Sequence, residues 1–207
     1  MNKSRIFSAI VIIMLFTGCT SAEESPSTEL PIIEDHPIKI LISEVLTGIE
    51  GNNQADFIEL YNAGTEIGDL QGYSLWYQLK DDSEEILIHT WNDSTLVPPL
   101  GYYALVQEGQ DFQIIPDLVI NQSLVPNRGG LVLRKGDKTE DRLAWGDGPA
   151  SLIEGSAANA MVPGSSLTRD LNPESGSQVD SENNQADFSL DPSPSLQNTS
   201  SPLNHPN

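Results

Sequence analysis

The chain has 207 residues, of which 38% are hydrophobic and 6% aromatic, which suits a single domain with polar extensions. Its 30 acidic residues outnumber its 10 basic residues and give a formal net charge of −20. Nucleic-acid phosphates and anionic lipid headgroups require basic patches, so this charge argues against nucleic acid as a partner and against charge-driven docking on lipid. It favours solubility, and at most a divalent cation or a basic partner.

The first 18 residues have the features of a targeting segment. Lys3 and Arg5 form a basic start, and residues 10–16 are an apolar run too short to span a membrane as a helix. Cys19, the only cysteine, follows this run and has no partner for an internal disulfide. The pentapeptide LFTGC, which ends at Cys19, resembles a bacterial lipobox, with phenylalanine where an aliphatic residue is more usual.

The lipobox resemblance implies a lipoprotein signal peptide at residues 1–18 and lipid attachment at Cys19. Acyl chains on this cysteine would anchor an exported protein to the bacterial cell envelope. Thr20, rather than aspartate, follows the cysteine, which is compatible with the outer membrane if the envelope is Gram-negative. The alternative is an ordinary secretory signal with an incidental cysteine. Residues 19–37, rich in serine, glutamate and proline, are expected to form a flexible acidic linker.

From residue 38 the sequence predicts short β-strands separated by polar turns, because apolar and polar residues alternate. In the segment ADFIELYNAG, Ile58 and Leu60 point to one side, Glu59 points to the other, and a turn begins at Asn62. A strand opening at Leu70 completes a hairpin-like unit. Strands are expected at 38–46, 55–61, 70–79, 85–91, 102–106, 131–134 and 141–145, with an irregular connection at 111–125 and a last edge strand at 166–169.

No window of helical length after the signal peptide shows a 3.6-residue period, so the expected fold class is all-β, a sandwich or a barrel. In their order along the chain, several blocks resemble the lamin-tail domain in its bacterial form, with Tyr73 in place of the usual tryptophan. The resemblance spans about residues 38–190. The blocks are ILISEVL (40–46), DFIELYNAG (56–64), DLQGYSL (69–75), LGYY (100–103), GGLVL (129–133), DRLAWG (141–146), GSSLTR (164–169) and NNQADF (183–188).

The lamin-tail resemblance implies an immunoglobulin-like β-sandwich without catalytic chemistry of its own, used in exported proteins for binding, adhesion or scaffolding. The domain is expected at residues 38–171 and a polar, disordered tail at 172–207. Within the tail, residues 180–190 are candidates for packing on the domain, with Phe188 as the anchor. The predicted partners are the membrane, through the acylated cysteine, and an unidentified envelope protein or glycan.

Glu44 and Glu59 stand out because both lie among core-strand residues, and Glu44 falls on the otherwise apolar side of its strand. They could form a carboxylate pair that holds a cation or performs acid–base chemistry. The favoured interpretation is structural, with each carboxylate accepting hydrogen bonds from a turn, from backbone N–H groups or from an arginine. The arginines considered are those at 134, 142 and 169. Asn62 is likewise interpreted as a turn-former.

No cofactor is expected, with calcium as the alternative. Asp180, Glu182 and Asn184 alternate as in the first part of a calcium loop, and Asp187 follows, but the glycine and distal glutamate of an EF-hand are missing. The segment VDSENNQADF therefore has a second interpretation as a polar surface segment. A calcium-dependent adhesin is one alternative function. A glycan-binding face is another, if some of the rings at 76, 77, 91, 102, 103 and 145 are exposed.

The lack of recognisable catalytic motifs in the sequence argues against an enzyme. The histidines, His36, His89 and His205, form no metal-binding motif, and no nucleophile elbow, phosphate loop or dinucleotide fingerprint is present. A triad whose members meet only in space leaves no such local pattern. The remaining enzymatic alternative is a cell-surface hydrolase or hydrolase accessory domain, which a convergent cluster of His89 or of Glu44 and Glu59 in an open pocket would support.

Overall fold

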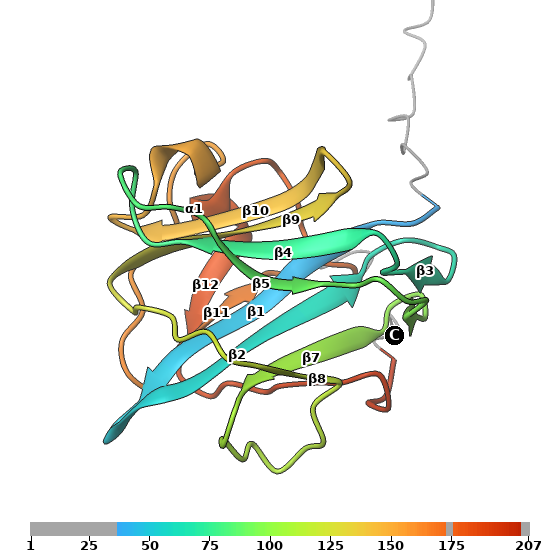
Figure 1. Cartoon of the computed structure of the whole chain (residues 1–207), viewed down its shortest axis with the longest axis horizontal. Helices are drawn as coiled ribbons and strands as arrows, with labels where there is room; N and C mark the ends of the chain where they lie inside the picture. Colours follow the sequence, from blue (N-terminus) through green and yellow to red (C-terminus); the bar gives the residue numbers. More distant parts are fainter. Residues whose placement is uncertain (1–36, 173–175, 204–207) are drawn as a thin grey trace, which may run out of the picture. The chain divides into compact units, whose positions relative to one another are not determined.

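The computed structural model describes residues 37–172 and 176–203, so the predicted signal peptide, Cys19 and nearly all of the predicted linker lie outside the described residues. Two β-sheets pack face to face as an immunoglobulin-like sandwich, which confirms the predicted all-β class (Figure 1). In this described part of the chain, no helix has the length and apolar character needed to cross a membrane.

The larger sheet has six strands in the order β12-β11-β1-β2-β7-β8. All neighbours are antiparallel except β7 and β8, which are parallel. A long register ties β1 to β2, so the segment ADFIELYN lies in the middle of this sheet. The strand bounds are β1 (Ile40–Ile49), β2 (Asn52–Asn62), β7 (Tyr102–Gln107), β8 (Leu118–Ile120), β11 (Ser166–Arg169) and β12 (Phe188–Asp191).

The smaller sheet has four antiparallel strands in the order β10-β9-β4-β5. Two further short strands pair with each other, and two single-turn helices complete the described elements. The bounds are β4 (Tyr73–Gln78), β5 (Ile86–Thr90), β9 (Arg128–Lys135), β10 (Lys138–Gly146), the pair β3 (Gly68–Asp69) and β6 (Leu96–Val97), the 3₁₀ helix η1 (Ala150–Leu152) and α1 (Asn184–Asp187).

The core lies between the two sheets, where alternate residues of facing strands meet. Ile58 and Leu60 of β2 and Leu133 of β9 are fully buried members of one continuous cluster. Trp145 joins the same cluster, and its indole Nε1 donates to the carbonyl of Val125 over 2.8 Å. The period-two pattern of the sequence therefore selects the faces that meet.

Three predicted connections differ in the structure. The expected hairpin is wrong, because the turn at Asn62 carries the chain from β2 in the larger sheet to β4 in the smaller sheet. The connection at 111–125 contains β8, which pairs with β7 in parallel. The strand at 166–169 is an inner strand, since β11 pairs with β1 on one side and with β12 on the other.

The structure places residues 180–190 on the domain, as the candidate packing segment, and the predicted disordered tail is wrong for residues 192–203. Phe188 is 3% exposed and packs in the core as the predicted anchor, and it opens β12, which pairs residue by residue with β11. Beyond β12, residues 192–203 form no strand, yet backbone N–H groups of this segment donate to side chains of the larger sheet. Sequence-distant pairing of this kind leaves no local periodic pattern, so composition alone suggested a mobile tail.

Candidate functional site

Two buried glutamates lie on the outer face of the larger sheet. Glu44 of β1 and Glu59 of β2 are direct partners across the ladder, and each is 2% exposed. Between Ile42 and Glu44 the register shifts by one residue, a β-bulge that moves Glu44 onto the face of Glu59 and away from the core. The bulge explains why Glu44 falls where strict alternation would place an apolar residue.

Glu59 ends a chain of hydrogen bonds. Gln178 Nε2 donates to Ser43 Oγ over 2.5 Å, and Ser43 Oγ donates to Glu59 Oε1 over 2.7 Å. The backbone N–H of Gln197 donates to the other oxygen, Oε2, over 2.6 Å. Burial raises the pKa of Glu59 to about 8; the charge of Glu44 adds to the rise, and the hydrogen bonds from Ser43 and Gln197 oppose it. Glu59 is therefore mostly protonated at neutral pH.

Glu44 is satisfied in the same way. Ser166 Oγ donates to Glu44 Oε1 over 2.5 Å, and the backbone N–H of Ser195 reaches the same oxygen over 3.3 Å. Burial raises the pKa of Glu44, against the hydrogen bond from Ser166. Serines and backbone N–H groups thus satisfy both glutamates, as the structural interpretation expects, whereas the three arginines pair elsewhere. Their partners are Glu85 for Arg134, Glu154 for Arg142 and Asp141 for Arg169.

A small cavity of about 160 Å³ lies beside the two glutamates. Hydroxyl, amide and carboxyl groups surround it, and the hydroxyl of Ser43 is donated to Glu59. The cavity therefore offers hydrogen-bonding groups. Its lining residues are Ser43, Glu44, Glu59, Tyr102, Thr168, Arg169, Leu171, Gln178, Ser195 and Gln197.

Arg169 of β11 joins the two sheets through the interior. Its Nη2 donates to both carboxylate oxygens of Asp141 in β10, over 2.9 and 2.7 Å, and its Nε donates to the carbonyl of Ile42 in β1 over 2.8 Å. Asp141 in turn accepts the N–H of Ile42 over 2.6 Å. The guanidinium also lies over the ring of Phe188, 4.5 Å from its centroid. One side chain therefore ties together β1, β10, β11 and β12.

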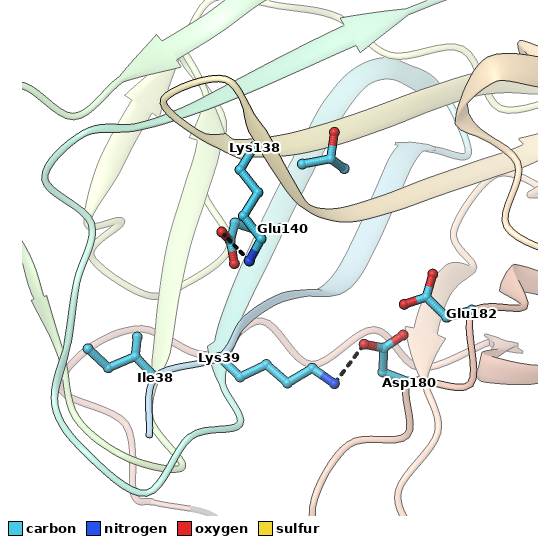
Figure 2. A pocket seen from close by; sticks show the side chains of 7 residues that line it. Ile38, Lys39, Lys138, Glu140, Asp180 and Glu182 are labelled. Atoms are coloured by element: carbon cyan, nitrogen blue, oxygen red, sulfur yellow. Dashed lines mark ion pairs between the residues drawn. The ribbon is translucent and has the colours of Figure 1, made fainter. Parts of the chain in front are cut away.

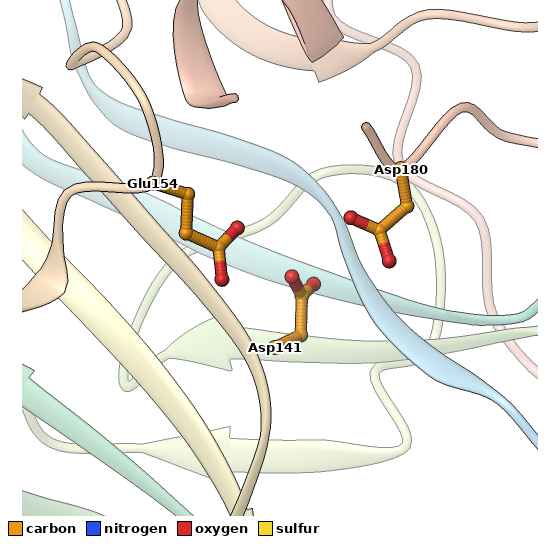
Figure 3. Close-up of side chains that lie close together, drawn as sticks. All are labelled: Asp141, Glu154 and Asp180. Carbon is orange, nitrogen blue, oxygen red and sulfur yellow. The ribbon is translucent and has the colours of Figure 1, made fainter. Parts of the chain in front are cut away.

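Three carboxylates gather beside Arg169 and form the strongest candidate for a metal site. The oxygens of Asp141, Glu154 and Asp180 lie within 4.8 Å of one another (Figure 3). Oxygen clusters of this kind bind calcium, but each of these acids already has a cationic side chain as its partner. The partners are Arg169 for Asp141 at 2.7 Å, Arg142 for Glu154 at 3.1 Å and Lys39 for Asp180 at 2.7 Å. The cluster is the acidic half of an ion-pair network.

The acids of this network titrate differently because their surroundings differ. Burial raises the pKa of Asp141 to about 6, although the charge of Arg169 opposes the rise. Burial and the charge of Asp141 raise the pKa of Glu154 to about 7. Burial also acts to raise the pKa of Asp180, but the hydrogen bond and charge of Lys39, with the charge of Arg169, outweigh it and lower the value. Asp180 therefore stays ionised while Glu154 is near its midpoint at neutral pH.

The four residues predicted as calcium ligands do not converge as one set. Asp180 belongs to the acidic cluster, and Glu182 is exposed. Asn184 is buried, and its side-chain oxygen accepts the N–H groups of Ala144 and Glu154, over 3.1 Å each. In α1, the carboxylate of Asp187 accepts the N–H and the hydroxyl of Ser181, over 2.9 and 2.5 Å. Asn184 thus fastens this part of the chain to the sandwich, and Asp187 holds the turn before α1.

Asn62 holds the turn that follows β2. Its side-chain oxygen accepts the N–H of Gly64 over 2.9 Å, and its Nδ2 donates to the carbonyls of Glu66 and Val97, over 2.9 Å each. The side chain is fully buried. These contacts are those of a side chain that forms and holds a turn.

The structure keeps His89 apart from the glutamate pair. His89 lies on β5 of the smaller sheet, where it packs edge-on against Trp91, with 4.9 Å between ring centroids. Burial lowers its pKa. Glu44 and Glu59 together line a cavity on the other sheet, and His89 is not among its lining residues, so the structure brings the two glutamates together without the histidine.

The aromatic side chains considered for a glycan face are mostly in the interior. Trp76 is half-buried, and the guanidinium of Arg134 lies over it, 5.7 Å from the ring centroid. The other five are buried: Tyr77, Trp91, Tyr102, Tyr103 and Trp145. These six residues therefore do not form the exposed row of rings that sugar stacking would require.

A larger pocket of about 280 Å³ lies where the chain enters β1 (Figure 2). Four of its five charged side chains form ion pairs: Lys39 with Asp180 over 2.7 Å, and Lys138 with Glu140 over 3.1 Å. Both lysines of the pocket are therefore already neutralised within it. The lining residues are Ile38, Lys39, Lys138, Thr139, Glu140, Asp180 and Glu182.

Sequence reasoning missed the pair of Arg169 with Asp141 and the contribution of Gln178. A signal for the first was present, since Arg169 comes two residues after the core residue Leu167 and so points to the same face of its strand. An arginine on a core face needs a buried acid as its partner. Gln178 left no comparable signal, because it lies in a polar segment.

No protein-family model matches this chain, and a comparison with curated proteins finds no match.

Proposed function

We propose that this chain is a lipid-anchored lipoprotein of the bacterial cell envelope that presents a lamin-tail-like domain as a non-catalytic binding, adhesion or scaffolding module. The observation that carries the proposal is that the buried charged side chains pair with one another and serve the fold. Asp141 and Arg169 are paired inside the sandwich and join its sheets, and Glu154 is paired with Arg142, so these buried charges hold the fold. Interaction would then take place on the outer surface of a rigid domain.

The positions of the lamin-tail-like blocks support the family proposal. FIEL lies in β2, and LQGYSL leads into β4 at Tyr73. GGLVL and DRLAWG form the adjacent strands β9 and β10, and SLTR is β11. Each of these blocks therefore supplies a strand, or the turn that leads into one, in a two-sheet sandwich, which is the architecture that the resemblance implies.

Retention of an envelope component by the soluble chain tests the binding role. A chain starting after Cys19 (residues 20–207), immobilised and exposed to solubilised envelope material, should retain a component that excess free chain displaces. Residues 192–203 must be kept, because Ser195 and Gln197 satisfy the glutamates of the larger sheet. The heat-unfolded chain is the control. Retention no greater than on that control would contradict the proposed module.

Replacing Cys19 with serine should release the protein from membranes, because serine cannot carry the thioether-linked lipid that the proposed anchor requires. The measurement is the share of the protein that sediments with membranes. A matched change in the adjoining linker, Ser21→Ala, should leave that share unchanged. If the Cys19→Ser protein still sediments with membranes after a high-salt wash, the lipid anchor is not what holds it.

A further inference from the structure

The C-terminal segment at residues 192–203 lies across the outer face of the larger sheet. Figure 1 draws it in red, running from the end of β12 towards β7 and β8. Its sequence, PSPSLQNTSSPL, contains no charged residue, although the whole chain carries a net charge of −20. The segment has no strand ladder of its own. Side chains of the domain therefore hold it in place.

Alternate backbone N–H groups of the segment meet three carboxylates of the domain. Ser195 donates to Glu44 over 3.3 Å, and Gln197 donates to Glu59 over 2.6 Å. Two residues further on, Thr199 donates to Asp117 with its N–H over 3.0 Å and with its hydroxyl over 2.5 Å. Positions two apart in an extended chain present their N–H groups to the same side, so the row of carboxylates fits the backbone of an extended peptide.

One aliphatic side chain is held between these contacts. Leu196 packs on an apolar cluster on the outer face, separate from the core between the sheets. Next to it, Asn198 Nδ2 donates to the carbonyl of Ile115 over 2.8 Å. The cluster consists of the buried residues Leu46, Phe57 and Val106, with Phe112 and Leu196 packed against it. We call the three carboxylates, Glu44, Glu59 and Asp117, together with this cluster, the outer groove.

The outer groove selects its occupant by hydrogen-bond donors and by backbone. Its three acids accept N–H groups, and an ionised carboxylate in the segment would offer them no donor, which fits the uncharged character of residues 192–203. The segment contacts the three acids only with backbone N–H groups and one hydroxyl, so these contacts place few demands on its side chains beyond the aliphatic anchor. A foreign segment of similar chemistry would make the same contacts.

We propose that the outer groove is a docking site for an extended, uncharged or basic peptide segment with one aliphatic anchor, and that the chain's own tail occupies it until such a partner displaces the tail. This inference rests on the proposed function as a binding module and names its partner class. A tethered segment has a local concentration on the order of millimolar, so it masks the groove from weak ligands. Release of the tail therefore makes the groove available.

The test uses a labelled synthetic peptide, PSPSLQNTSSPL, and full chains with altered tails. Leu196→Asp removes the anchor and adds a charge, while Gln197→Pro removes the N–H that Glu59 accepts. The matched control is Leu203→Asp, the same change at an exposed leucine of the same segment. Fluorescence anisotropy should show binding to both release variants at least about tenfold tighter than to the native and control chains.

Changes in the peptide test the selectivity of the groove. Aspartate in place of the peptide's leucine should abolish binding, and lysine in place of the serine before that leucine should strengthen it. Absence of binding to release variants that keep the native near-ultraviolet circular dichroism would overturn the proposal, as would equal binding to native and release variants. Tail exchange between two copies, seen as concentration-dependent dimers in sedimentation, would also overturn it by identifying a second copy as the occupant.

The outcomes of the peptide test and of the envelope test distinguish failure of the outer groove from failure of the proposed function. If the peptide does not bind but the chain still retains an envelope component, the outer groove is not the site and the module remains. If the peptide binds but no envelope component is retained, the groove remains and the envelope role is lost.

Discussion

Replacing Arg169 with methionine should lower the free energy of unfolding by about 3–5 kcal/mol, because it leaves the carboxylate of Asp141 buried without its cation. Arg169 and Asp141 are 1% and 3% exposed, so water cannot take the place of the guanidinium. The carbonyls of Ile42 and Val179 lose their donor as well. For a domain of this size, the loss corresponds to a fall in melting temperature of roughly 10 °C, measurable by calorimetry.

Arg134→Met is the matched control for this prediction. Arg134 also makes two hydrogen bonds to one carboxylate, that of Glu85, over 2.8 Å each, but the pair lies at the surface with side chains 26% and 32% exposed. Exposed pairs contribute less than about 1 kcal/mol, so Arg134→Met should have little effect. Similar losses in the two variants would show that burial of the Arg169 pair is not what makes it important.

The loss of unfolding free energy in the Arg169→Met variant, relative to the native chain, should also be smaller at low pH. Protonation of Asp141 removes the unpaired charge, so the difference from the native chain should be smaller at pH 4 than at pH 8. A deficit independent of pH would point to lost packing on Phe188 instead, since that contact does not titrate.

The strands could be predicted because their signal is local. Alternation along DFIELYN and GGLVLR reports which side of each strand is buried, and both segments form strands. The bulge at Ser43 was not predictable, because a one-residue shift is set by pairing with β2 and leaves the composition of β1 unchanged. The outward position of Glu44 therefore required the structure.

The contacts of β12 and of the C-terminal segment at residues 192–203 were not predictable for a similar reason. β12 pairs with β11 over a long sequence separation, and residues 195–199 reach carboxylates that come from three different parts of the chain. A polar segment rich in serine and proline looks the same whether it is free or laid on a surface. The groups that fix it, Glu44, Glu59 and Asp117, are informative only once they are seen in a row.

Lowering the pH from 8 to 5 should raise the free energy of unfolding, and Glu59 should account for much of the rise. The pKa of Glu59 is about 8 in the folded protein, against an ordinary value of 4.5 in the unfolded chain, because burial disfavours its charge. Between these values the folded state keeps a proton that the unfolded state releases, so stability falls as the pH rises. The contribution is complete below pH 4.5 and is lost above pH 8.

Other buried acids act in the same direction. Burial raises the pKa of Asp56 to about 6, and the raised pKa values of Asp141 and Glu154 are about 6 and 7. Each folded value exceeds the unfolded one, so each acid also favours the folded state more at pH 5 than at pH 8. Repulsion among the negative charges of a chain with a net charge of −20 also weakens as the pH falls. It therefore adds to the pH dependence of the unfolding free energy without being specific to any residue.

Glu59→Gln separates the specific part from this background. Glutamine imitates the protonated side chain at every pH, so the variant lacks the pH dependence that Glu59 contributes. The difference in unfolding free energy between pH 5 and pH 8 should therefore be smaller than in the native chain by roughly 3–4 kcal/mol, since one pKa unit corresponds to about 1.4 kcal/mol. The variant should be more stable than the native chain at pH 8 and similar at pH 5, as measured by urea unfolding at both values. The same change at the exposed Glu50, in the turn between β1 and β2, should preserve the native pH dependence. A native slope in the Glu59→Gln variant would mean that Glu59 is ionised beneath the C-terminal segment, held by the N–H of Gln197 and the hydroxyl of Ser43.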